Sequence, residues 1–363
     1  MRVIAAPDSF KGSIGAAAAA AALASGWLRV RPADELIQLP LADGGEGTLA
    51  VLAAAAPSAR WHAERVAGPV GEPVRAAWLE LAGNAAVVEL AAAAGLTLLA
   101  EPMPLAAHSY GVGELIASAL DAGARRIVIA LGGSACTDGG TGALTALGAR
   151  FEDAAGAVLP LGGGALRDLA RIDLTGLRPP PGGGVTCLTD VRAPLLGPDG
   201  AAAVFGPQKG ASRADVAVLD AGLARLASLL GGDPAEPGAG SAGGCGYGLA
   251  AAWGAGLRPG AAEIAMIAGL PAAIEGADLI ITGEGQYDAS SENGKVVGAV
   301  RAVAAAARPA AVPVAVVAGR MAVTPPAGVR AVELAALAGG PQAALADPGR
   351  WLADAAALLA TAA

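Results

Sequence analysis

The sequence predicts an α/β protein of two domains, a parallel-sheet domain interrupted by a large insert with a sheet of its own. Both ends of the chain repeat one pattern, in which a short apolar run leads into a glycine-rich turn and then a helical segment. Partly alternating segments separated by Gly/Pro turns fill the middle instead. A length of 363 residues is typical of two domains or one large one.

The N-terminal end contains two strand–turn–helix units. Residues 2–6 are predicted to be a strand and residues 14–29 a helix, with Ser13 as its N-cap. A second strand is expected over 35–41, and a second helix over 48–56. Two such units in succession favour a parallel sheet packed against helices.

The middle of the chain differs in its periodicity. Three segments between residues 61 and 90 alternate partly and predict an antiparallel meander. A helix follows over 112–122, and then a β-branched strand from Arg126 to Leu131, which runs into the turn of residues 132–140 and a further helix at 142–150. Loops are expected over 156–184, 192–210 and 232–248. They flank an amphipathic helix over 213–231 whose apolar face is Val216, Leu219, Leu223, Leu226 and Leu230.

The C-terminal end returns to the first pattern. Strands are predicted over 279–282, 312–318 and 329–334, and helices over 294–307 and 350–362. One discontinuous domain, residues 1–60 plus 270–363, is therefore expected to carry an inserted mixed α/β domain over 61–269. Two crossings between domains predict a cleft and a hinge, with the active site in the cleft.

Composition excludes several classes of protein. A net charge of −8 without a cluster of Lys or Arg argues against nucleic-acid binding. No apolar stretch of about 20 residues could span a membrane, and the N-terminus lacks the basic start and Leu-rich centre of an export signal. Three widely spaced cysteines form no metal-binding or disulfide pattern and are expected to be small buried residues in a reducing compartment. A cytoplasmic protein is expected.

Acidic residues follow five of the apolar runs. In open α/β sheets, ligands bind outside the carboxyl ends of the strands, so these acids are expected to share one crevice. Carboxylates among glycines suit a bound cation or a proton acceptor, and the alternative is a capping role. The acids are Asp8, Asp43 with Glu46, Asp138, Asp190 and Glu284.

Lysine is rare in a chain that otherwise uses arginine. Its three lysines, Lys11, Lys209 and Lys295, each lie beside a glycine-rich stretch. They are candidates for contacts with an anionic substrate, and surface lysine is the alternative.

Acids, lysines and glycine loops without a histidine motif fit phosphoryl transfer, which needs Mg²⁺, positive charge near the phosphates and a carboxylate near the attacking hydroxyl. The segment 289–296 lacks the first Gly and the final Ser/Thr of a Walker A motif. Residues 238–243 fit GxGxxG by letters but follow no strand, so dinucleotide binding is not expected. Backbone N–H groups there could still cradle a phosphate.

Six motifs in order resemble those of the bacterial type I glycerate kinases, nearly from end to end. They are Ala5-Ala-Pro-Asp-Ser-Phe-Lys-Gly-Ser13, Ala42-Asp-Gly-Gly-Glu-Gly-Thr48, Tyr110-Gly-Val-Gly-Glu-Leu-Ile116, Gly132-Gly-Ser-Ala-Cys-Thr-Asp-Gly-Gly140, Phe205-Gly-Pro-Gln-Lys-Gly210 and Ile281-Thr-Gly-Glu-Gly285. The resemblance implies a flavodoxin-like (Rossmann-like) domain with an inserted α/β domain. It also implies ATP-dependent phosphorylation of D-glycerate, typically to 2-phosphoglycerate, with the 3-position left open by the residues.

Roles for individual residues are expected from their positions at the ends of apolar runs and beside glycine-rich turns. Asp190 is expected to be the general base or to orient the hydroxyl, with a third metal ligand or a strand cap as alternatives. Lys11 and Lys295 are expected to act on phosphate or the glycerate carboxylate, and Asp43 and Asp138 on Mg²⁺. Substrate or nucleotide contacts are expected from Asp8, Ser9, Gly44, Gly45, Glu46, Gly132, Gly133, Ser134, Lys209, Gly283, Glu284 and Asp288.

One departure from the family pattern occurs after Glu284, where Ser290 stands in place of the usual Gln and removes one amide contact. A non-catalytic sensor and another enzyme class, such as a phosphatase or dehydrogenase, remain alternatives to the kinase. The protein is expected to be a monomer or homodimer with small-molecule substrates.

Overall fold

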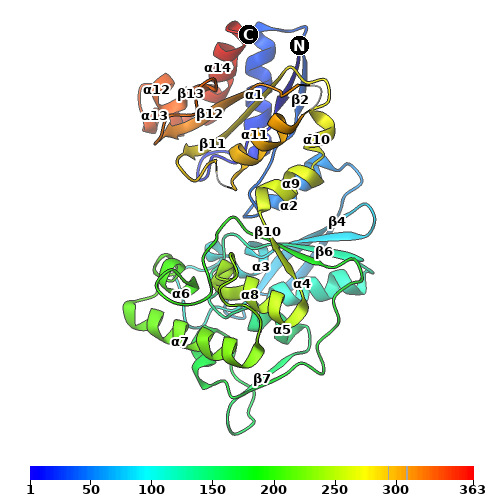
Figure 1. The fold of residues 1–363 in the computed structure, drawn as a ribbon, viewed down its shortest axis with the longest axis vertical. Coiled ribbons are helices and arrows are strands. Elements are labelled where there is room, and N and C mark those ends of the chain that lie inside the picture. The colour runs from blue at the N-terminus through cyan, green and yellow to red at the C-terminus, as the bar shows by residue number, and fades with distance from the viewer. Residues whose placement is uncertain (293, 308–309) are drawn as a thin grey trace. The chain divides into compact units, whose positions relative to one another are not determined.

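The computed structural model describes residues 1–292, 294–307 and 310–363. It divides into two compact units (Figure 1). Unit 1 comprises Met1–Asp43, Ala50–Pro57 and Pro259–Ala363, and unit 2 comprises Gly44–Leu49 and Ser58–Arg258. Compared with the predicted domain limits, unit 2 also takes in the Gly44–Leu49 turn, and the return to unit 1 occurs at Pro259 rather than at residue 270.

Unit 1 contains a five-stranded sheet in which every neighbouring pair is parallel. Its strands are β1 (Arg2–Ala5), β2 (Glu35–Gln38), β11 (Leu279–Tyr287), β12 (Val314–Met321) and β13 (Arg330–Glu333). The spatial order is β2-β1-β11-β12-β13, which is the flavodoxin-like order. The order reverses between β1 and β11, so a binding crevice is expected at the carboxyl ends of those two strands.

Helices cover both faces of this sheet. They are α1 (Ala16–Val30), α9 (Gly260–Ile267), α10 (Leu270–Ala273), α11 (Val296–Ala306), α12 (Leu334–Ala338), α13 (Pro341–Ala346) and α14 (Pro348–Thr361), and α2 (Thr48–Ala55) runs across the boundary between the units.

The two faces follow the period-2 alternation of strand side chains. Val3 and Ile281 pack against Leu23 and Trp27 of α1 and against α14, and each of these four residues is buried. Val316 lies on the opposite face, with α11. Fully burying one such side chain contributes about 1.5–3 kcal/mol, so this alternation fixes the register of the sheet.

Unit 2 contains a six-stranded mixed sheet in the order β10-β9-β6-β5-β4-β3. The predicted meander is confirmed, because β3–β4 and β4–β5 pair antiparallel, whereas β5–β6, β6–β9 and β9–β10 are parallel. The strands are β3 (Arg60–Ala67), β4 (Pro73–Leu81), β5 (Ala85–Glu89), β6 (Arg126–Ala130), β9 (Val185–Leu188) and β10 (Gly256–Arg258), and β7 (Arg150–Glu152) pairs separately with β8 (Arg171–Asp173).

The helices of unit 2 enclose one large core. Ile127 and Ile129 of β6 pack in it with Leu115 and Ile116 of α4. The helices are α3 (Ala91–Ala94), α4 (Tyr110–Asp121), α5 (Thr141–Ala146), α6 (Ala201–Phe205), α7 (Arg213–Leu230) and α8 (Ser241–Trp253), with short 3₁₀ turns η1 (Leu96–Leu98), η2 (Gly163–Asp168) and η3 (Pro207–Lys209). No helix within the described residues is long and apolar enough to cross a membrane.

Several local predictions were wrong. Ser13 does not cap α1, which begins at Ala16 after Gly15 and has no side-chain cap. All three predicted loops contain regular structure. The loop over 156–184 contains η2 and β8, the loop over 192–210 contains α6 and η3, and the loop over 232–248 contains the start of α8. In α8, Ala242, Gly243 and Gly244 have positive φ, which concealed this helix from a periodicity argument.

Candidate active site

A pocket of about 350 Å³ lies in unit 1 and contains several of the predicted site residues. Asp8 and Lys11 reach it from the loop after β1, and Glu284 reaches it from β11. These are the two strands between which the sheet order reverses. The residues that line the pocket are Asp8, Ser9, Phe10, Lys11, Ser13, Asp43, Glu284, Gly285, Gln286, Asp288, Lys295, Gly319, Arg320, Leu334, Pro341, Ala344, Leu345 and Pro348.

Two lysines are paired with acids in this pocket. Lys11 Nζ lies 3.0 Å from Asp43 Oδ2, and its side chain is 76% exposed, so it can reach a ligand from solvent. Lys295 Nζ lies 3.8 Å from Glu284 Oε2 and 3.6 Å from Asp288 Oδ1. Both lysines can therefore meet an anion at the edge of an acidic cluster.

Asp8 is the most perturbed of these acids. Its side chain is buried, and burial raises its pKa from 3.8 to about 7, with the negative charge of Asp43 as the second cause. The backbone N–H of Ser9 donates to Asp8 Oδ1 at 2.6 Å and opposes that rise. A carboxyl group whose pKa lies near neutral pH, with other acids nearby, is typical of a functional site.

Glu284 has a second unusual property. Burial also raises its pKa, and its Oε1 atom is buried without a hydrogen-bond partner among the described residues. A buried oxygen without a donor is costly, and a cation would satisfy it. Asp8, Asp43 and Glu284 line the same pocket and carry the carboxylate oxygens that Mg²⁺ prefers. One or two of them, completed by water and phosphate oxygens, are enough to hold this ion.

Glycines near the pocket allow β11 and β12 to approach closely. A Cβ atom at Gly283 would lie 2.0 Å from the carbonyl oxygen of Val317, and one at Gly319 would lie 2.4 Å from that of Gly285. Gly283, expected to contact substrate, therefore has a packing role in the structure. Asn293, in the segment that precedes Lys295, lies outside the described residues.

The other predicted glycines and Glu46 lie in unit 2. The N–H of Gly132 donates to the carbonyl of Gly44 at 3.1 Å, and a Cβ atom at Gly132 would lie 2.5 Å from the Cα of Gly45. The turn with Gly44, Gly45 and Glu46 thus packs against the turn with Gly132 and Gly133.

Glu89, which our sequence analysis missed, holds the first of these turns. Its carboxylate accepts hydrogen bonds from the N–H groups of Gly47 at 3.1 Å and Leu49 at 3.3 Å, at the start of α2. Burial raises its pKa, and these bonds oppose the rise. The signal was present, because Glu89 is also an acid at the end of an apolar run, but we assigned that run to the meander only.

Asp138 is fully buried, and its environment differs from a Mg²⁺ site. Its Oδ2 atom accepts hydrogen bonds from the N–H and hydroxyl of Ser109, both at 2.8 Å, and from the N–H of Gly142 at 3.1 Å. Its Oδ1 atom accepts from the N–H of Gly140 at 3.1 Å and faces the thiol of Cys245. This geometry matches the capping alternative, and the metal role expected for Asp138 stays a prediction.

Lys209 is also buried, which excludes the surface alternative, and its expected substrate contact stays a prediction. Its Nζ atom donates to Ser134 Oγ at 2.8 Å and to the carbonyl of Cys136 at 2.5 Å, and burial lowers its pKa. Lys209 therefore holds the turn of residues 132–140 from within unit 2, whereas Ser134 is half-buried.

Asp190 follows β9 in unit 2, and its side chain is partly exposed. Next to it, the hydroxyls of Thr189 and Ser241 are 2.6 Å apart. The roles expected for Asp190 stay predictions. Pocket residues that our sequence analysis missed include Gln286 and Arg320, which lie in β11 and β12 beyond the predicted ends of those strands.

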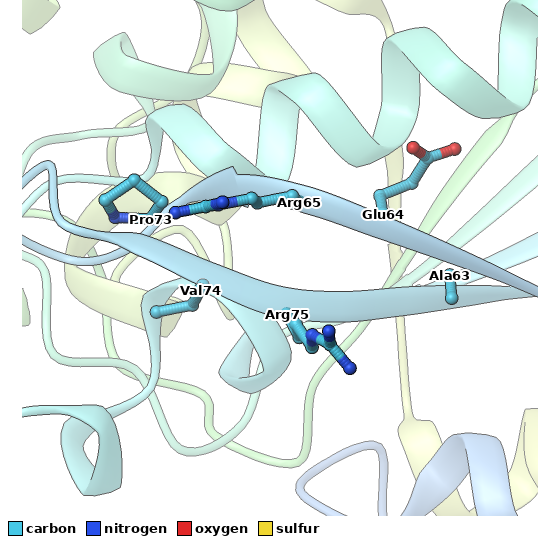
Figure 2. Close-up of a pocket in the computed structure, with 6 residues that line it drawn as sticks. All are labelled: Ala63, Glu64, Arg65, Pro73, Val74 and Arg75. Carbon is cyan, nitrogen blue, oxygen red and sulfur yellow. The ribbon is translucent and has the colours of Figure 1, made fainter.

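A second hollow, of about 600 Å³, lies on the β3–β4 hairpin of unit 2 (Figure 2). Arg65 and Arg75 are opposite each other in the strand register, and both are exposed. None of the predicted site residues lines this hollow. We therefore place the candidate chemistry in the unit 1 pocket.

Comparison with known proteins gives consistent matches. The sequence model of the Glycerate kinase family matches residues 3–363. The chain is 44% identical to glycerate 2-kinase of Escherichia coli K12, over 82% of this chain and 80% of that protein. It is also 44% identical to glycerate kinase of Bacillus subtilis 168, over 81% and 79% of the two chains.

Two further matches extend over more of the chain. An uncharacterised protein of Mycobacterium bovis is 46% identical, over 97% of this chain and 89% of that protein. A crystal structure from Salmonella typhimurium LT2, named provisionally as glycerate kinase 2, has a TM-score of 0.84 and 38% identity, and covers 100% of this chain and 98% of that one.

Proposed function

The chain belongs to the glycerate kinase family, and on that basis we propose that it transfers the γ-phosphoryl group of ATP to D-glycerate, giving 2-phosphoglycerate and ADP. The choice of the 2-hydroxyl is supported by the name of the Escherichia coli relative, glycerate 2-kinase.

The unit 1 pocket carries this proposal. Four carboxylates and two lysines line one pocket at the reversal point of a flavodoxin-like sheet. Phosphoryl transfer depends mainly on positioning and on charge, so it needs few reactive side chains beyond this set. The lining also includes the apolar residues Leu334, Pro341 and Leu345. A nucleotide suits this lining, because its base has flat apolar faces and its triphosphate is anionic.

Roles follow from the contacts. We propose that Asp8, Asp43 and Glu284 hold Mg²⁺, which when bound supplies positive charge at the phosphate oxygens. Lys11 and Lys295 already lie beside these acids, and they would exchange their acid partners for phosphate oxygens when the nucleotide enters. A cation between the carboxylates would lower the pKa of Asp8 from about 7 towards the usual range, so that Asp8 is ionised in the complex.

The group that orients the glycerate hydroxyl is not among the acids of the unit 1 pocket in this proposal. Asp190 keeps this proposed role, with a third metal ligand as the rival. The two roles differ in one property, because losing a metal ligand weakens Mg·ATP binding and losing the base does not.

A coupled assay of ADP release tests the proposal. We expect release that requires both glycerate and Mg²⁺, and that falls at least about 100-fold in Glu284→Gln, which keeps the side-chain size and removes the charge. A matched control is Glu275→Gln, because Glu275 does not line the pocket. ATP hydrolysis at a rate indifferent to glycerate would contradict the proposal.

A further inference from the structure

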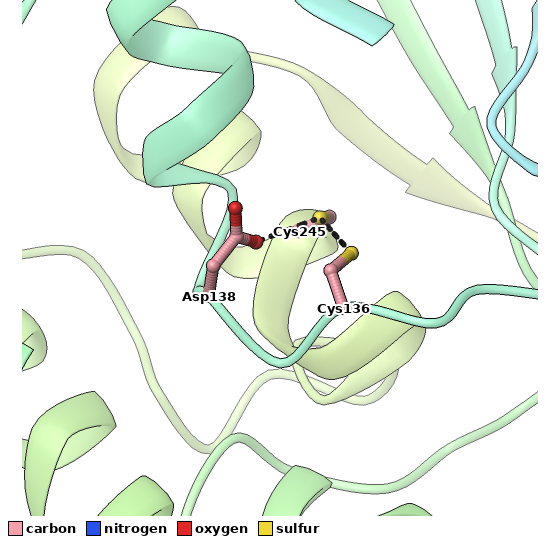
Figure 3. A group of neighbouring side chains, drawn as sticks. All are labelled: Cys136, Asp138 and Cys245. Atoms are coloured by element: carbon pink, nitrogen blue, oxygen red, sulfur yellow. Dashed lines mark hydrogen bonds between the residues drawn. The ribbon is translucent and has the colours of Figure 1, made fainter. Parts of the chain in front are cut away.

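Two thiols and a carboxylate meet in the interior of unit 2 (Figure 3). Cys136 and Asp138 lie in the turn after β6, and Cys245 lies in α8. The Cys136 and Cys245 Sγ atoms are 3.8 Å apart, and Cys245 Sγ is 3.6 Å from Asp138 Oδ1. All three side chains are buried, and their ligand atoms lie within 4.8 Å of one another.

These distances match two edges of a tetrahedral zinc site. With Zn–S near 2.3 Å and Zn–O near 2.0 Å, a tetrahedral angle gives S···S of about 3.8 Å and S···O of about 3.5 Å. The donor set also selects the metal, because thiolates favour Zn²⁺ over Mg²⁺. Three protein ligands leave a fourth place for water or a hydroxyl group.

The charges balance with and without an ion. The carboxyl group of Asp138 accepts hydrogen bonds at both oxygens, and the Lys209 side chain lies within electrostatic reach of Asp138 and both cysteines. One negative and one positive charge cancel while both thiols keep their protons. A divalent cation that replaces those two protons leaves the sum unchanged, so the interior gains no net charge.

The backbone around the cluster is fixed before any ion binds. The N–H of Gly139 donates to the carbonyl of Gly243 at 3.0 Å, and a Cβ atom at Gly243 would lie 2.2 Å from the carbonyl oxygen of Cys136. Donors from Ser109 and Gly142 orient the carboxylate of Asp138. Fixed partners of this kind are what hold metal ligands in place. In the same turn, Thr137 Oγ1 is buried without a hydrogen-bond partner among the residues that the structure describes.

We propose that Cys136, Asp138 and Cys245 form a binding site for a thiophilic divalent cation, Zn²⁺, which clamps the turn of residues 132–140 to α8. This site is separate from the carboxylate pocket of unit 1 and takes a different class of metal. All three ligands are buried, so we assign the ion to holding the turn against α8 and not to contact with substrate.

Cobalt is the probe for this site, because thiolate-to-Co²⁺ charge transfer reports sulfur ligation. Full-length reduced protein is freed of metal by chelation and titrated with Co²⁺, both in the native state and during refolding, which gives buried ligands access to the ion. We expect one Co²⁺ per chain with thiolate charge transfer, displacement by Zn²⁺, and release of about two protons per Zn²⁺ in weakly buffered solution.

Variants separate this site from other thiols. Cys245→Ala and Cys136→Ala should each lower Co²⁺ affinity at least about 100-fold, whereas Cys187→Ala, which removes a buried thiol of β9 outside the cluster, should keep it. Zn²⁺ should also raise the Tm of the wild type and of Cys187→Ala, but not that of Cys245→Ala.

Two results obtained with the wild-type protein would overturn the proposal. One is the absence of thiolate charge transfer in wild-type protein under both loading conditions. The other is Co²⁺ uptake with an all-oxygen, octahedral spectrum. Undiminished affinity in a folded Cys245→Ala protein would overturn it as well.

Discussion

Replacing Asp8 with Asn should make the ligand-free protein more stable while it abolishes function. Burial of the wild-type carboxyl group, together with the negative charges of Asp43 and Glu284, raises its pKa from 3.8 to about 7. Asn has nearly the same shape, and its amide oxygen can still accept the hydrogen bond from the N–H of Ser9. The substitution therefore removes an unfavourable charge without opening a cavity.

The magnitude follows from linkage between protonation and folding. Because the folded-state pKa is raised, the wild type has no penalty below pH 3.8 and loses stability as the pH rises towards 7. A rise from 3.8 to about 7 costs roughly 2 kcal/mol at pH 5 and roughly 4 kcal/mol at pH 8. The advantage of Asp8→Asn should thus grow by about 2–3 kcal/mol between these pH values.

Urea unfolding without Mg²⁺ at pH 5 and pH 8 measures this advantage, with Asp168→Asn as the control because the Asp168 side chain is 64% exposed. Saturating Mg²⁺ should reduce the difference at pH 8, since a cation relieves the repulsion only in the wild type. An advantage of Asp8→Asn that is the same at both pH values would refute the reasoning. So would an Asp8→Asn protein with normal kinase turnover, which would remove Asp8 from the site.

Three further substitutions test other parts of the account. Lys11→Met should lower kcat/KM at least about 100-fold, near 3 kcal/mol, as for the loss of one charge-assisted contact; the control Arg29→Met should not, and a loss under about threefold would assign Lys11 to the surface. Asp190→Asn should cut kcat strongly and leave the affinity for Mg·ATP nearly intact; partial rescue by raised Mg²⁺ would favour the metal-ligand role, and near-normal turnover would exclude both roles. Gly283→Ala should destabilise unit 1 by about 3 kcal/mol or more in urea unfolding, because its Cβ would lie 2.0 Å from the Val317 oxygen; stability within about 0.5 kcal/mol of the wild type would contradict this packing role.

Sequence periodicity predicted the sheets well because burial and alternation are local properties. The strands of unit 1, the meander of unit 2 and the buried leucines of α7 all follow from apolar spacing. The start of α8 could not be predicted in this way. Its first turn depends on positive φ at Gly243 and Gly244, a conformation imposed by close contacts with the turn of residues 132–140.

The site was predictable in its residue types and less so in its grouping. Asp8, Asp43 and Glu284 line one pocket with Lys11 and Lys295, as their positions after strands suggest. Burial decided the other cases. Asp138 and Lys209 follow the same sequence pattern but lie in the interior of unit 2, with hydrogen-bond partners from segments far apart in the chain.

Phosphorus NMR of the reaction mixture tests most directly whether the chain is a glycerate 2-kinase. Wild-type protein is incubated with ATP, Mg²⁺ and D-glycerate, and the new phosphomonoester signal is recorded without proton decoupling. A phosphate on the 2-oxygen couples to one proton and gives a doublet, whereas one on the 3-oxygen couples to two and gives a triplet. We predict the doublet, growing as ATP is consumed and absent with Glu284→Gln. A triplet would contradict the 2-position. Inorganic phosphate and ADP without any new phosphomonoester signal would contradict phosphoryl transfer to glycerate.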